Sequence, residues 1–463
     1  MTTPLLTELP YHEDSARLFE TIADLPWAAF LDSGKRYAAH ARYDILVAEP
    51  YATLVTRGKV TEIRIHGASE LSPEDPFTLL KRHLAPAQEN HCGLPFSGGA
   101  LGYFGYDLAR RLERLPVIAE DAEKLPEMAI GIYDWAVVVD HHSRRSYLAS
   151  CGRDAETQKK WDELVNCFSQ PAEERFRAPF RITSKIATNL TPEHYAQAFQ
   201  RIHDYIRAGD CYQVNLAQRF SAAAAGDPWL AYQALRILNP APFSAYLNTP
   251  YAQILSASPE RFLKLKDRQV ETKPIKGTRP RAGHPRLDAA LAEALRESEK
   301  DRAENLMIVD LLRNDLGKSC ETGSVKVPKL FEVEGFATVH HLVSTVTGTL
   351  AKDKSALDLL RGCFPGGSIT GAPKLRAMQI IEELEPNRRG VYCGAIGYIG
   401  FDGGMDTNIV IRTLVYSAGT IRFWAGGGIV IDSHMEDEYQ ETFDKASAML
   451  RLLEQILMAD VGR

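Results

Sequence analysis

The sequence lacks the features of an exported or membrane-bound chain. Its N-terminus, MTTPLLTELPYHEDSARLFE, has no basic start followed by an apolar core, and no apolar run approaches the ~18 residues that span a bilayer. The seven cysteines are scattered, odd in number and free of any CxxC pair, which argues against a disulfide framework and a zinc site. We therefore expect a cytoplasmic protein with reduced thiols and no membrane contact.

An excess of positive charge is also missing. The net charge is -6, which argues against a nucleic-acid-binding protein, whose domains are normally basic. An anionic ligand must therefore be attracted by local cations and not by the overall field. A glutaminase nucleophile is absent too, because no cysteine lies in a glycine-rich GxCxG turn. The remaining profile, 45% hydrophobic and 25% charged, is typical of a soluble globular enzyme.

The length of 463 residues exceeds one compact core and predicts two lobes or one large two-layer domain. Residues 1–170 carry short β-rich runs between turns, and GIYDWAVVVDHHSRRSYLAS within them reads as a β-hairpin. The polar residues 171–190 predict a linker, and residues 191–458 form the second domain. Helices do not alternate regularly with strands, so we expect an α+β fold.

Local signals place several elements of the second domain. Thr191 caps a helix that Pro192 begins and Gly209 ends, because these residue types favour those positions. A long helix is expected over residues 286–314, and a final helix over residues 435–458, where apolar residues recur at helical spacing. The run NIVIRTLVY reads as a single strand.

Two pairs of carboxylates lie at helical spacing. Glu438 and Glu441 share one face of the final helix with Lys445. Asp301 and Glu304 share a face of the long helix. If the two helices converge, the four carboxylates could hold Mg²⁺, which prefers oxygen ligands. The alternative, on spacing alone, is a solvated face of paired charges.

Other motifs suit an anion, each with a structural alternative. The glycines of AGGGIV, Gly426–Gly428, weaken a strand unless another group approaches the backbone closely or the chain bends there. Arg412, in the neighbouring strand, could bind a carboxylate or form a structural ion pair. GGSITGAPK ends at a helix start that suits an anion, although Thr370 could serve only as a cap. His341 lies in a β-like segment, and Glu260 follows a strand end.

Together these stretches resemble the chorismate-utilising enzymes, which include anthranilate synthase, aminodeoxychorismate synthase and the isochorismate and salicylate synthases. The resemblance covers roughly residues 190–450, the chorismate-binding domain. It rests on GDCYQVNLAQRF, SPERF, PIKGTRPR, KDRAENLMIVDLLRND, HHLVST, GGSITGAPK, GAIGY, IRTL, AGGGIV and EYQETFDK. LPFSGGALGYFGYD and YDW resemble the N-terminal region of the amidotransferase-linked members. The resemblance implies large antiparallel β-sheets in a sandwich-like core flanked by helices.

The resemblance also implies roles for the candidate residues. Glu304 and Glu441 would bind Mg²⁺ directly or nearly so, and Asp301 and Glu438 would support its water shell. One departure is Asp301, where some relatives carry Glu. The metal would hold the ring carboxylate of chorismate. The residues expected to bind the substrate or to line its ring are Arg412, Tyr392, Gly426, Gly427, Gly428, Lys445, Gly277, Thr278, Thr370 and His341.

Two positions distinguish the members of this family. In the isochorismate and salicylate synthases, which the chain resembles, the position of Gln213 is occupied by a lysine. That lysine is a base that activates water. Gln213 cannot act as a base, so ammonia becomes the better nucleophile. Anthranilate synthases carry PIAGT where this chain has PIKGT, and aminodeoxychorismate synthases carry the lysine, Lys276. The sequence therefore favours amination at C4 of chorismate over amination at C2, which is the alternative.

Lys276 is expected to be a covalent nucleophile. It would attack C2 of chorismate while Glu260 protonates the departing C4 hydroxyl, and ammonia would then attack C4 and expel the lysine from C2. The amine must be neutral to attack, and we expect burial and the nearby cations Lys273, Arg279 and Arg281 to lower its pKa. The alternative is that Lys276 only pairs with a carboxylate.

The resemblance implies one protein partner and a second pocket. A separate glutamine amidotransferase subunit would form a heterodimer with the chain and supply ammonia. FLDSGKRYAAHARYD and NPAPFSAY resemble the tryptophan-binding segments of anthranilate synthase. Asp32 and Phe243 depart from that pattern, and a non-catalytic tryptophan-binding subunit remains an alternative. The residues expected to line the tryptophan pocket are Ser33, Arg42, Tyr43, Pro242 and Phe243.

Overall fold

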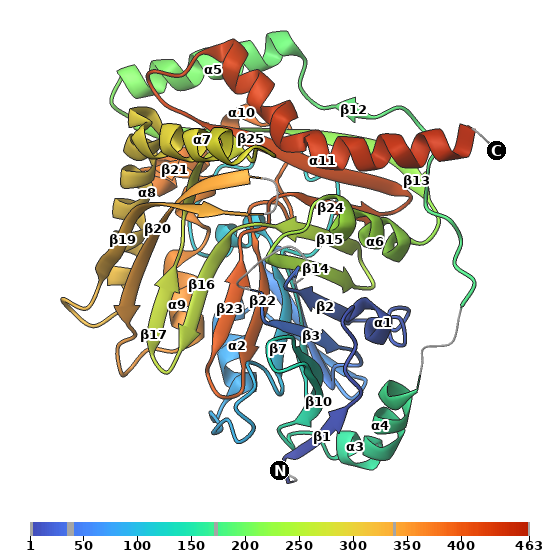
Figure 1. The fold of residues 1–463 in the computed structure, drawn as a ribbon. Helices are drawn as coiled ribbons and strands as arrows, with labels where there is room; N and C mark the ends of the chain where they lie inside the picture. The colour runs from blue at the N-terminus through green and yellow to red at the C-terminus, as the bar shows by residue number, and fades with distance from the viewer. Residues whose placement is uncertain (1–2, 35–40, 171–174, 337–338, 462–463) are drawn as a thin grey trace.

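Two large antiparallel β-sheets dominate the computed structural model, which describes residues 3–34, 41–170, 175–336 and 339–461 (Figure 1). The 13-stranded first sheet has 11 strands in one continuous order, and β12 (Ala187–Thr188) and β21 (Gly371–Ala372) pair with its strand β13. That order is β1 (Leu5–Leu9), β10 (Arg145–Ser150), β9 (Trp135–Asp140), β3 (Tyr43–Val47), β2 (Ala28–Asp32), β14 (Phe243–Asn248), β15 (Gln253–Ser258), β24 (Thr413–Ser417), β25 (Thr420–Ile429), β13 (Gln213–Ala225) and β11 (Arg181–Ile182).

The second sheet has 12 strands, of which β19 (Lys326–Gly335) pairs only with β20. The continuous order is β18 (Ile275–Pro280), β20 (Val339–Thr349), β17 (Gln269–Thr272), β16 (Arg261–Lys266), β23 (Met405–Asn408), β22 (Ala395–Gly400), β7 (Gly99–Phe104), β8 (Met128–Tyr133), β4 (Ala52–Arg57), β5 (Val60–Ile65) and β6 (Ala68–Ser72). The predicted α+β fold with large antiparallel sheets is therefore confirmed.

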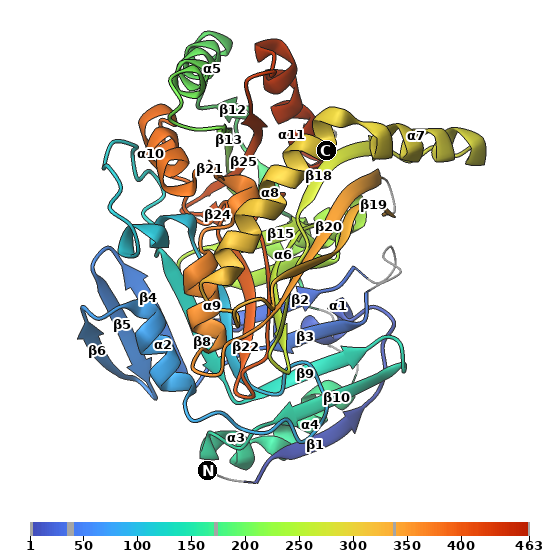
Figure 2. The same ribbon diagram turned by 90° about the vertical axis from the view of Figure 1, so that its left-hand side faces the viewer.

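Helices cover the outer faces of the two sheets. Figure 2 shows α2, α8 and α9 along the outside of the second sheet, whereas α11 lies across the first sheet in Figure 1. Among the described residues, no helix is both long and apolar enough to cross a membrane. The helices are α1 (Ala16–Phe19), α2 (Pro76–Leu84), η1 (Tyr106–Arg111), α3 (Ala155–Lys159), α4 (Trp161–Ser169), α5 (Pro192–Arg207), α6 (Pro228–Leu238), α7 (Pro285–Glu297), α8 (Glu299–Gly317), α9 (Ala356–Cys363), η2 (Gly367–Ile369), α10 (Lys374–Leu384) and α11 (Met435–Val461).

The apolar side chains form a core on both faces of the first sheet. One cluster joins alternate residues such as Ile45 and Val138 of the first sheet to Leu54 and Ile130 of the second. A second cluster joins the opposite-facing residues of the first sheet to α1, α4, α6 and α11. This alternation is what the period of two in a β-strand predicts for a sheet that is buried on both sides.

Both sheets cross the predicted boundary between residues 1–170 and 191–458. In the first sheet β2 pairs with β14, and in the second β7 pairs with β22. Strands from both parts therefore share each sheet. The division into two domains stays a prediction, and residues 171–174 of the predicted linker lie outside the described residues.

Two predicted elements are each interrupted in the structure. The prediction of one long helix over 286–314 is wrong, because the helix is interrupted at Ser298. The Ser298 side chain caps α8 by accepting a hydrogen bond from the Asp301 N–H at 3.3 Å. The single strand expected for NIVIRTLVY is also wrong. The chain leaves the second sheet after Asn408 and enters the first at Thr413, and Arg412 in the crossing has a φ of 53°.

The hairpin and the predicted helix after Thr191 are confirmed. β9 and β10 pair around a four-residue turn, and α5 begins at Pro192 with the Thr191 side chain accepting from the His194 N–H at 3.3 Å. The final helix begins at Met435 as expected and continues to Val461. These elements depend on short-range signals, which explains why the sequence located them.

Candidate active site

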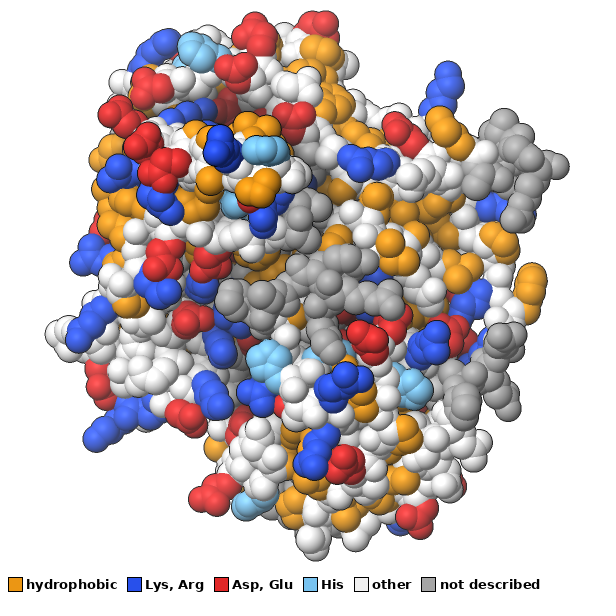
Figure 3. Space-filling model, in the orientation of Figure 1, with side chains coloured by type: hydrophobic (Ala, Val, Ile, Leu, Met, Phe, Trp, Pro, Cys, Tyr) orange, Lys and Arg blue, Asp and Glu red, His pale blue; other side chains and the backbone are white. Residues whose placement is uncertain are grey.

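The candidate residues gather where α8 and β18 of the second sheet approach α11 and β25 of the first. α8 packs on β18 and β20, and α11 packs on β25. Figures 1 and 2 both place α8 and α11 beside the end of β25. On the face drawn in Figure 3, acidic and basic side chains interleave over this upper part of the molecule, so no field of a single sign covers it.

The two carboxylates of α11 lie side by side and differ in exposure. Glu438 is 2% exposed and accepts a hydrogen bond from the Ser433 hydroxyl at 2.6 Å. The Lys300 ammonium lies 3.7 Å from the same carboxylate. Glu441 is more exposed and pairs with Lys445 at 2.6 Å. The spacing of three residues thus places both carboxylates on the face of α11 that looks toward α8 and β25.

The two carboxylates of α8 lie against β18. Glu304 is 3.9 Å from the Lys276 ammonium, and Asp301 pairs with Arg279 at 3.0 Å. β18 bulges after Lys276, where Gly277 has a φ of 73°. A Cβ at Gly277 would lie 2.8 Å from the Asp301 carboxyl carbon. Glycine at this position therefore permits both the backbone conformation and the close approach of α8.

The carboxylates have the chemistry of a site for a hard cation, although they do not converge on one point. Among the described residues, no group of three or more His, Cys, Asp or Glu side chains is arranged to hold a metal. One Glu438 oxygen, Oε2, is buried without a hydrogen-bond partner in the described part of the chain. Burial and the neighbouring charge of Glu441 raise the pKa of Glu438. An unpartnered buried carboxylate oxygen beside a second carboxylate fits a divalent cation.

The glycine-rich strand provides space for these carboxylates. A Cβ at Gly427 would lie 2.9 Å from Glu438 Oε2 and 3.5 Å from Glu441 Oε2. A Cβ at Gly428 would collide with the amide of Gln213. β25 nevertheless pairs with β13 along its length, with Gly426 opposite Ala217, so the glycines do not weaken the strand. Close approach, one of the two predicted reasons for the glycines, is confirmed, whereas their contact with a substrate carboxylate stays a prediction.

Gln213 occupies the start of β13 and is 1% exposed. Its side-chain oxygen is buried without a hydrogen-bond partner among the described residues. An amide held in this way presents an acceptor and not a base. Its geometry is compatible with the expectation that water is not activated here.

The three cations near Lys276 in the sequence are each held in an ion pair. The ion pairs are Lys273–Glu334 at 2.5 Å, Arg279–Asp301 at 3.0 Å and Arg281–Asp288 at 2.8 Å. These carboxylates offset the repulsion that the cations exert on Lys276, and the Lys276 ammonium itself lies 3.9 Å from Glu304. The neutral state of the Lys276 amine stays a prediction.

Glu260 is a buried carboxyl group in the connection between β15 and β16. It is 5% exposed, and burial raises its pKa to about 7 against the opposing hydrogen bond from Ser368 and the charge of Lys276. A carboxyl group with this pKa can hold a proton near neutral pH and release it during a reaction. Glu260 therefore has the protonation behaviour of a general acid, and it lies within electrostatic range of Lys276.

His341 and Thr278 face each other across β18 and β20. Their register pairs them, and the Thr278 hydroxyl lies 3.0 Å from His341 Nδ1. The imidazole packs edge-on against Phe336. Burial lowers the pKa of His341 to about 4, so the ring is neutral at physiological pH. A neutral imidazole can orient a ring or share a hydrogen bond, but it adds no charge to the site.

Thr370 is fully buried and directly follows η2. Its hydroxyl donates to the Gly366 carbonyl at 3.0 Å, and its own carbonyl accepts from the Asn215 N–H at 2.8 Å. The hydroxyl does not cap α10, whose N-cap residue is Pro373, so the capping alternative is wrong for that helix. The predicted position beside the substrate ring stays a prediction.

Arg412, Lys445 and Tyr392 come from three different elements. The Arg412 guanidinium donates to the Lys445 carbonyl at 2.6 Å, and burial lowers the pKa of Arg412. Lys445 donates to the Gly426 carbonyl at 3.0 Å. The Tyr392 ring stacks on Trp424 with centroids 5.9 Å apart and planes within 7°. Two cations and an aromatic pair thus border the glycine strand, where an anion could be bound.

The residues predicted for a tryptophan pocket share one cavity of ≈ 1690 Å³. It is also lined by Pro259 and Ile275, the neighbours of Glu260 and Lys276 in sequence. Residues 35–40 of the motif FLDSGKRYAAHARYD lie outside the described residues. The five predicted residues that line the cavity are Ser33, Arg42, Tyr43, Pro242 and Phe243.

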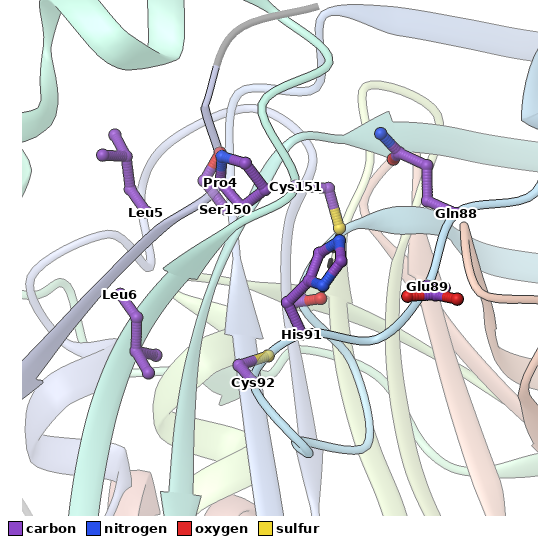
Figure 4. A pocket seen from close by; sticks show the side chains of 10 residues that line it. Pro4, Leu5, Leu6, Gln88, Glu89, His91, Cys92, Ser150 and Cys151 are labelled. Carbon is purple, nitrogen blue, oxygen red and sulfur yellow. Dashed lines mark hydrogen bonds between the residues drawn. The ribbon is translucent and has the colours of Figure 1, made fainter.

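Two of the predicted polar side chains in this cavity already have partners. The Ser33 hydroxyl donates to Asp44 at 2.6 Å, and Arg42 pairs with Asp140 at 2.9 Å. A smaller cavity of ≈ 230 Å³ lies elsewhere, between the start of β1 and residues 88–97 (Figure 4). It contains none of the predicted site residues.

Four residues at the site were not predicted from the sequence. Lys300 lies four residues before Glu304, so the helical spacing could have identified it. Ser368, Ser433 and Trp424 contact site residues through the fold; Ser368 lies within the motif GGSITGAPK, whereas no local pattern marks Ser433 and Trp424.

The comparisons with known proteins identify the family of the chain. The model of the chorismate binding enzyme family matches residues 31–451. The chain is 50% identical over 458 residues to aminodeoxychorismate synthase component 1 of Klebsiella aerogenes, which covers 98% of this chain and 100% of that relative. It is 42% identical over 392 residues, 84% of each chain, to anthranilate synthase component 1 of Thermus thermophilus.

Solved structures show the same fold. Anthranilate synthase component I from Streptococcus pneumoniae superposes with a TM-score of 0.80 at 36% identity, covering 89% of this chain and 93% of that one. The menaquinone-specific isochorismate synthase of Escherichia coli has a TM-score of 0.73 at 18% identity, covering 97% and 94%, and shares the fold alone. The family that the sequence motifs indicated is thereby confirmed: the chain belongs to the chorismate binding enzymes.

Proposed function

We propose that the chain aminates chorismate at C4 to give 4-amino-4-deoxychorismate, on the route to para-aminobenzoate and folate. The observation that carries the proposal is the placement of Lys276 beside Glu304 and within electrostatic range of the buried acid Glu260. The 50% identity to aminodeoxychorismate synthase component 1 over nearly the whole chain supports it.

The acid and the nucleophile can be generated by one proton transfer. A proton passed from the Lys276 ammonium to the Glu260 carboxylate leaves a neutral amine and a protonated acid. The amine attacks C2 of chorismate, the ring double bond shifts, and the C4 hydroxyl leaves as water with the Glu260 proton. Ammonia then attacks C4 and expels the Lys276 amine, so that one ammonia replaces one water overall. Two displacements preserve the configuration at C4.

The remaining residues bind and orient the substrate in this proposal. Glu304 and Glu441, supported by Asp301 and Glu438, would hold Mg²⁺, which neutralises the ring carboxylate of chorismate when bound. Arg412 and the ammonium of Lys445 balance the substrate's charge at the glycine strand.

Ammonia is proposed to come from a glutamine amidotransferase subunit. The word "component" in the names of the relatives indicates that those enzymes have more than one part. The tryptophan pocket is proposed in the ≈ 1690 Å³ cavity, as a structural site separate from the chemistry.

The product distinguishes this function from amination at C2. Purified chain is incubated with chorismate, Mg²⁺ and an ammonium salt, and the products are separated and weighed by mass spectrometry. We expect an amino product that retains the pyruvyl group. Anthranilate, which is aromatic and fluorescent and has lost that group, would contradict the proposal.

The pH dependence of the reaction should report Glu260. Glu260 must first accept the proton of the Lys276 ammonium, and its pKa is about 7, so kcat/KM at a constant concentration of NH₃ should fall as pH falls below 7, where solvent protonates the carboxylate. At the acid end the slope should approach tenfold per pH unit. Total ammonium is adjusted at each pH to keep NH₃ fixed. Glu260→Gln, which can neither accept nor donate this proton, should show low activity without that acid limb, and a flat wild-type profile between about pH 5 and 7.5 would exclude Glu260 as the acid.

A further inference from the structure

Behind the candidate site lies a buried arginine that the proposed chemistry does not use. Arg389 is 1% exposed and follows α10. It pairs with Glu385 through two hydrogen bonds, of 2.9 and 2.6 Å. Taking both charges out of water has a cost that the pair's own attraction only partly offsets, so a buried pair is weak evidence of a stabilising role. The remaining contacts of the guanidinium therefore need a separate explanation.

Apart from a contact with Cys393 Sγ at 3.5 Å, those contacts lead to the walls of the site. Arg389 donates to the Ile369 carbonyl at 2.9 Å, immediately before Thr370, and to the Asn215 carbonyl at 3.0 Å. Its partner Glu385 accepts from the Ala217 N–H at 2.9 Å. Asn215 and Ala217 lie in β13, directly opposite the glycine strand of β25. One ion pair thus fixes two points of β13 and the segment that precedes Thr370.

The same guanidinium lies between two aromatic rings. Its carbon is 5.0 Å from the Tyr106 ring centroid and 5.7 Å from that of Tyr392. Tyr392 in turn stacks on Trp424, which lies in β25 two residues before Gly426. Contact with Arg389 therefore links the position of Tyr392 to that of the β13 backbone, and cation–π attraction favours this arrangement.

We infer that Arg389, held by Glu385, is a positioning residue of the active site. It sets the relative positions of Thr370, Tyr392 and the β13–β25 pair without touching the substrate. The inference rests on the proposed function, because it assumes that these elements bind chorismate. A planar guanidinium with five donors can bind Glu385, Ile369 and Asn215 at once, whereas a lysine ammonium cannot match this geometry.

Positioning and stability can be separated by variants. Arg389→Lys keeps a cation beside Glu385, so we expect a folded protein. It loses the planar guanidinium, which donates several hydrogen bonds at once. A displacement of about 1 Å in reacting groups can cost on the order of 10²-fold in rate, and we expect kcat per folded molecule to fall by about that factor. The double variant Arg389→Met/Glu385→Leu removes both charges and leaves no unpaired one, and it should lose a similar factor.

A matched control cluster lies between the same helix and η1. Glu382 of α10 binds Arg110 of η1 and faces the segment around Ile118 instead of β13. Arg110 also pairs with the buried Asp107 at 3.0 Å, so the control removes all three charges. Arg110→Met/Glu382→Leu/Asp107→Asn should lower the unfolding midpoint by an amount comparable to the Arg389 double variant, yet it should change kcat by about twofold or less.

The experiment measures chorismate consumption, product identity and thermal unfolding for the wild type, the Arg389 variants and the control. A fall in kcat confined to the Arg389 variants supports the inference. Folded Arg389→Lys with kcat within threefold of the wild type overturns it, whether or not the double variant folds. Failure of the proposed function appears separately, as a wrong product from the wild type, because chorismate consumption reports kcat for either aminated product.

Discussion

Replacing Lys276 by alanine should abolish amination, with a loss in kcat on the order of 10³-fold or more per folded molecule, because the first displacement then has no nucleophile. The structure places this side chain at a bulge of β18, 3.9 Å from Glu304 and within electrostatic range of Glu260. Steady-state rates with chorismate, Mg²⁺ and ammonium measure the effect.

Arginine at the same position separates nucleophilicity from charge. Lys276→Arg keeps a cation for Glu304, but a guanidinium stays protonated in proteins and cannot attack carbon. We expect it to be as inactive as Lys276→Ala. A second control, Lys273→Ala, removes a neighbouring cation that pairs with Glu334, and it should change the rate by only about twofold. Substantial activity in Lys276→Arg would show that position 276 supplies charge alone.

The second large effect concerns the carboxylates. Mn²⁺, which takes the same oxygen ligands as Mg²⁺, serves as the probe ion, and its binding is measured by calorimetry without substrate. Glu441→Gln and Glu304→Gln should each weaken Mn²⁺ binding by more than 10–100-fold, the loss in affinity that follows removal of an outer-shell partner. Glu438 Oε2 and Glu441 Oε2 both face the bare backbone of Gly427, and the buried Glu438 oxygen has no hydrogen-bond partner within residues 3–34, 41–170, 175–336 and 339–461. A neutral amide retains the shape of the side chain and removes the charge that attracts the ion.

The matched control for these variants is Glu436→Gln, one turn or less from Glu438 on α11. Glu436 is exposed, so its loss should leave Mn²⁺ affinity and activity unchanged within about twofold. Equal Mn²⁺ affinity in Glu441→Gln and wild type would remove the proposed metal site. Amination that persists at full rate after exhaustive chelation would do the same.

The parts of the fold that depend on neighbouring residues could be predicted. Thr191 and Pro192 mark the start of α5, and Glu438 and Glu441 lie on one face of α11, as their spacing requires. The break at Ser298 could not be predicted, because helical patterns continue on both sides of it. Only the fold shows that Ser298 ends one helix and caps the next.

The surroundings of Lys276 could not be predicted for a different reason. Its neighbours in sequence are cations, yet the fold neutralises Lys273 with Glu334, 61 residues away, and Arg279 with Asp301, 22 residues away. Likewise, β2 and β14 are distant in sequence and pair in the first sheet. Charge and pairing between distant segments depend on topology, which local patterns do not specify.

The most direct measurement is the mass of the peptide that contains PIKGTRPR. The chain is incubated with chorismate and Mg²⁺ without ammonia, so that the second displacement cannot occur, then quenched and digested. We predict a mass increase equal to chorismate minus one water, located on Lys276, and its disappearance when ammonium is added. An unmodified peptide at every time point, from enzyme that aminates chorismate at full rate once ammonium is present, would contradict the account.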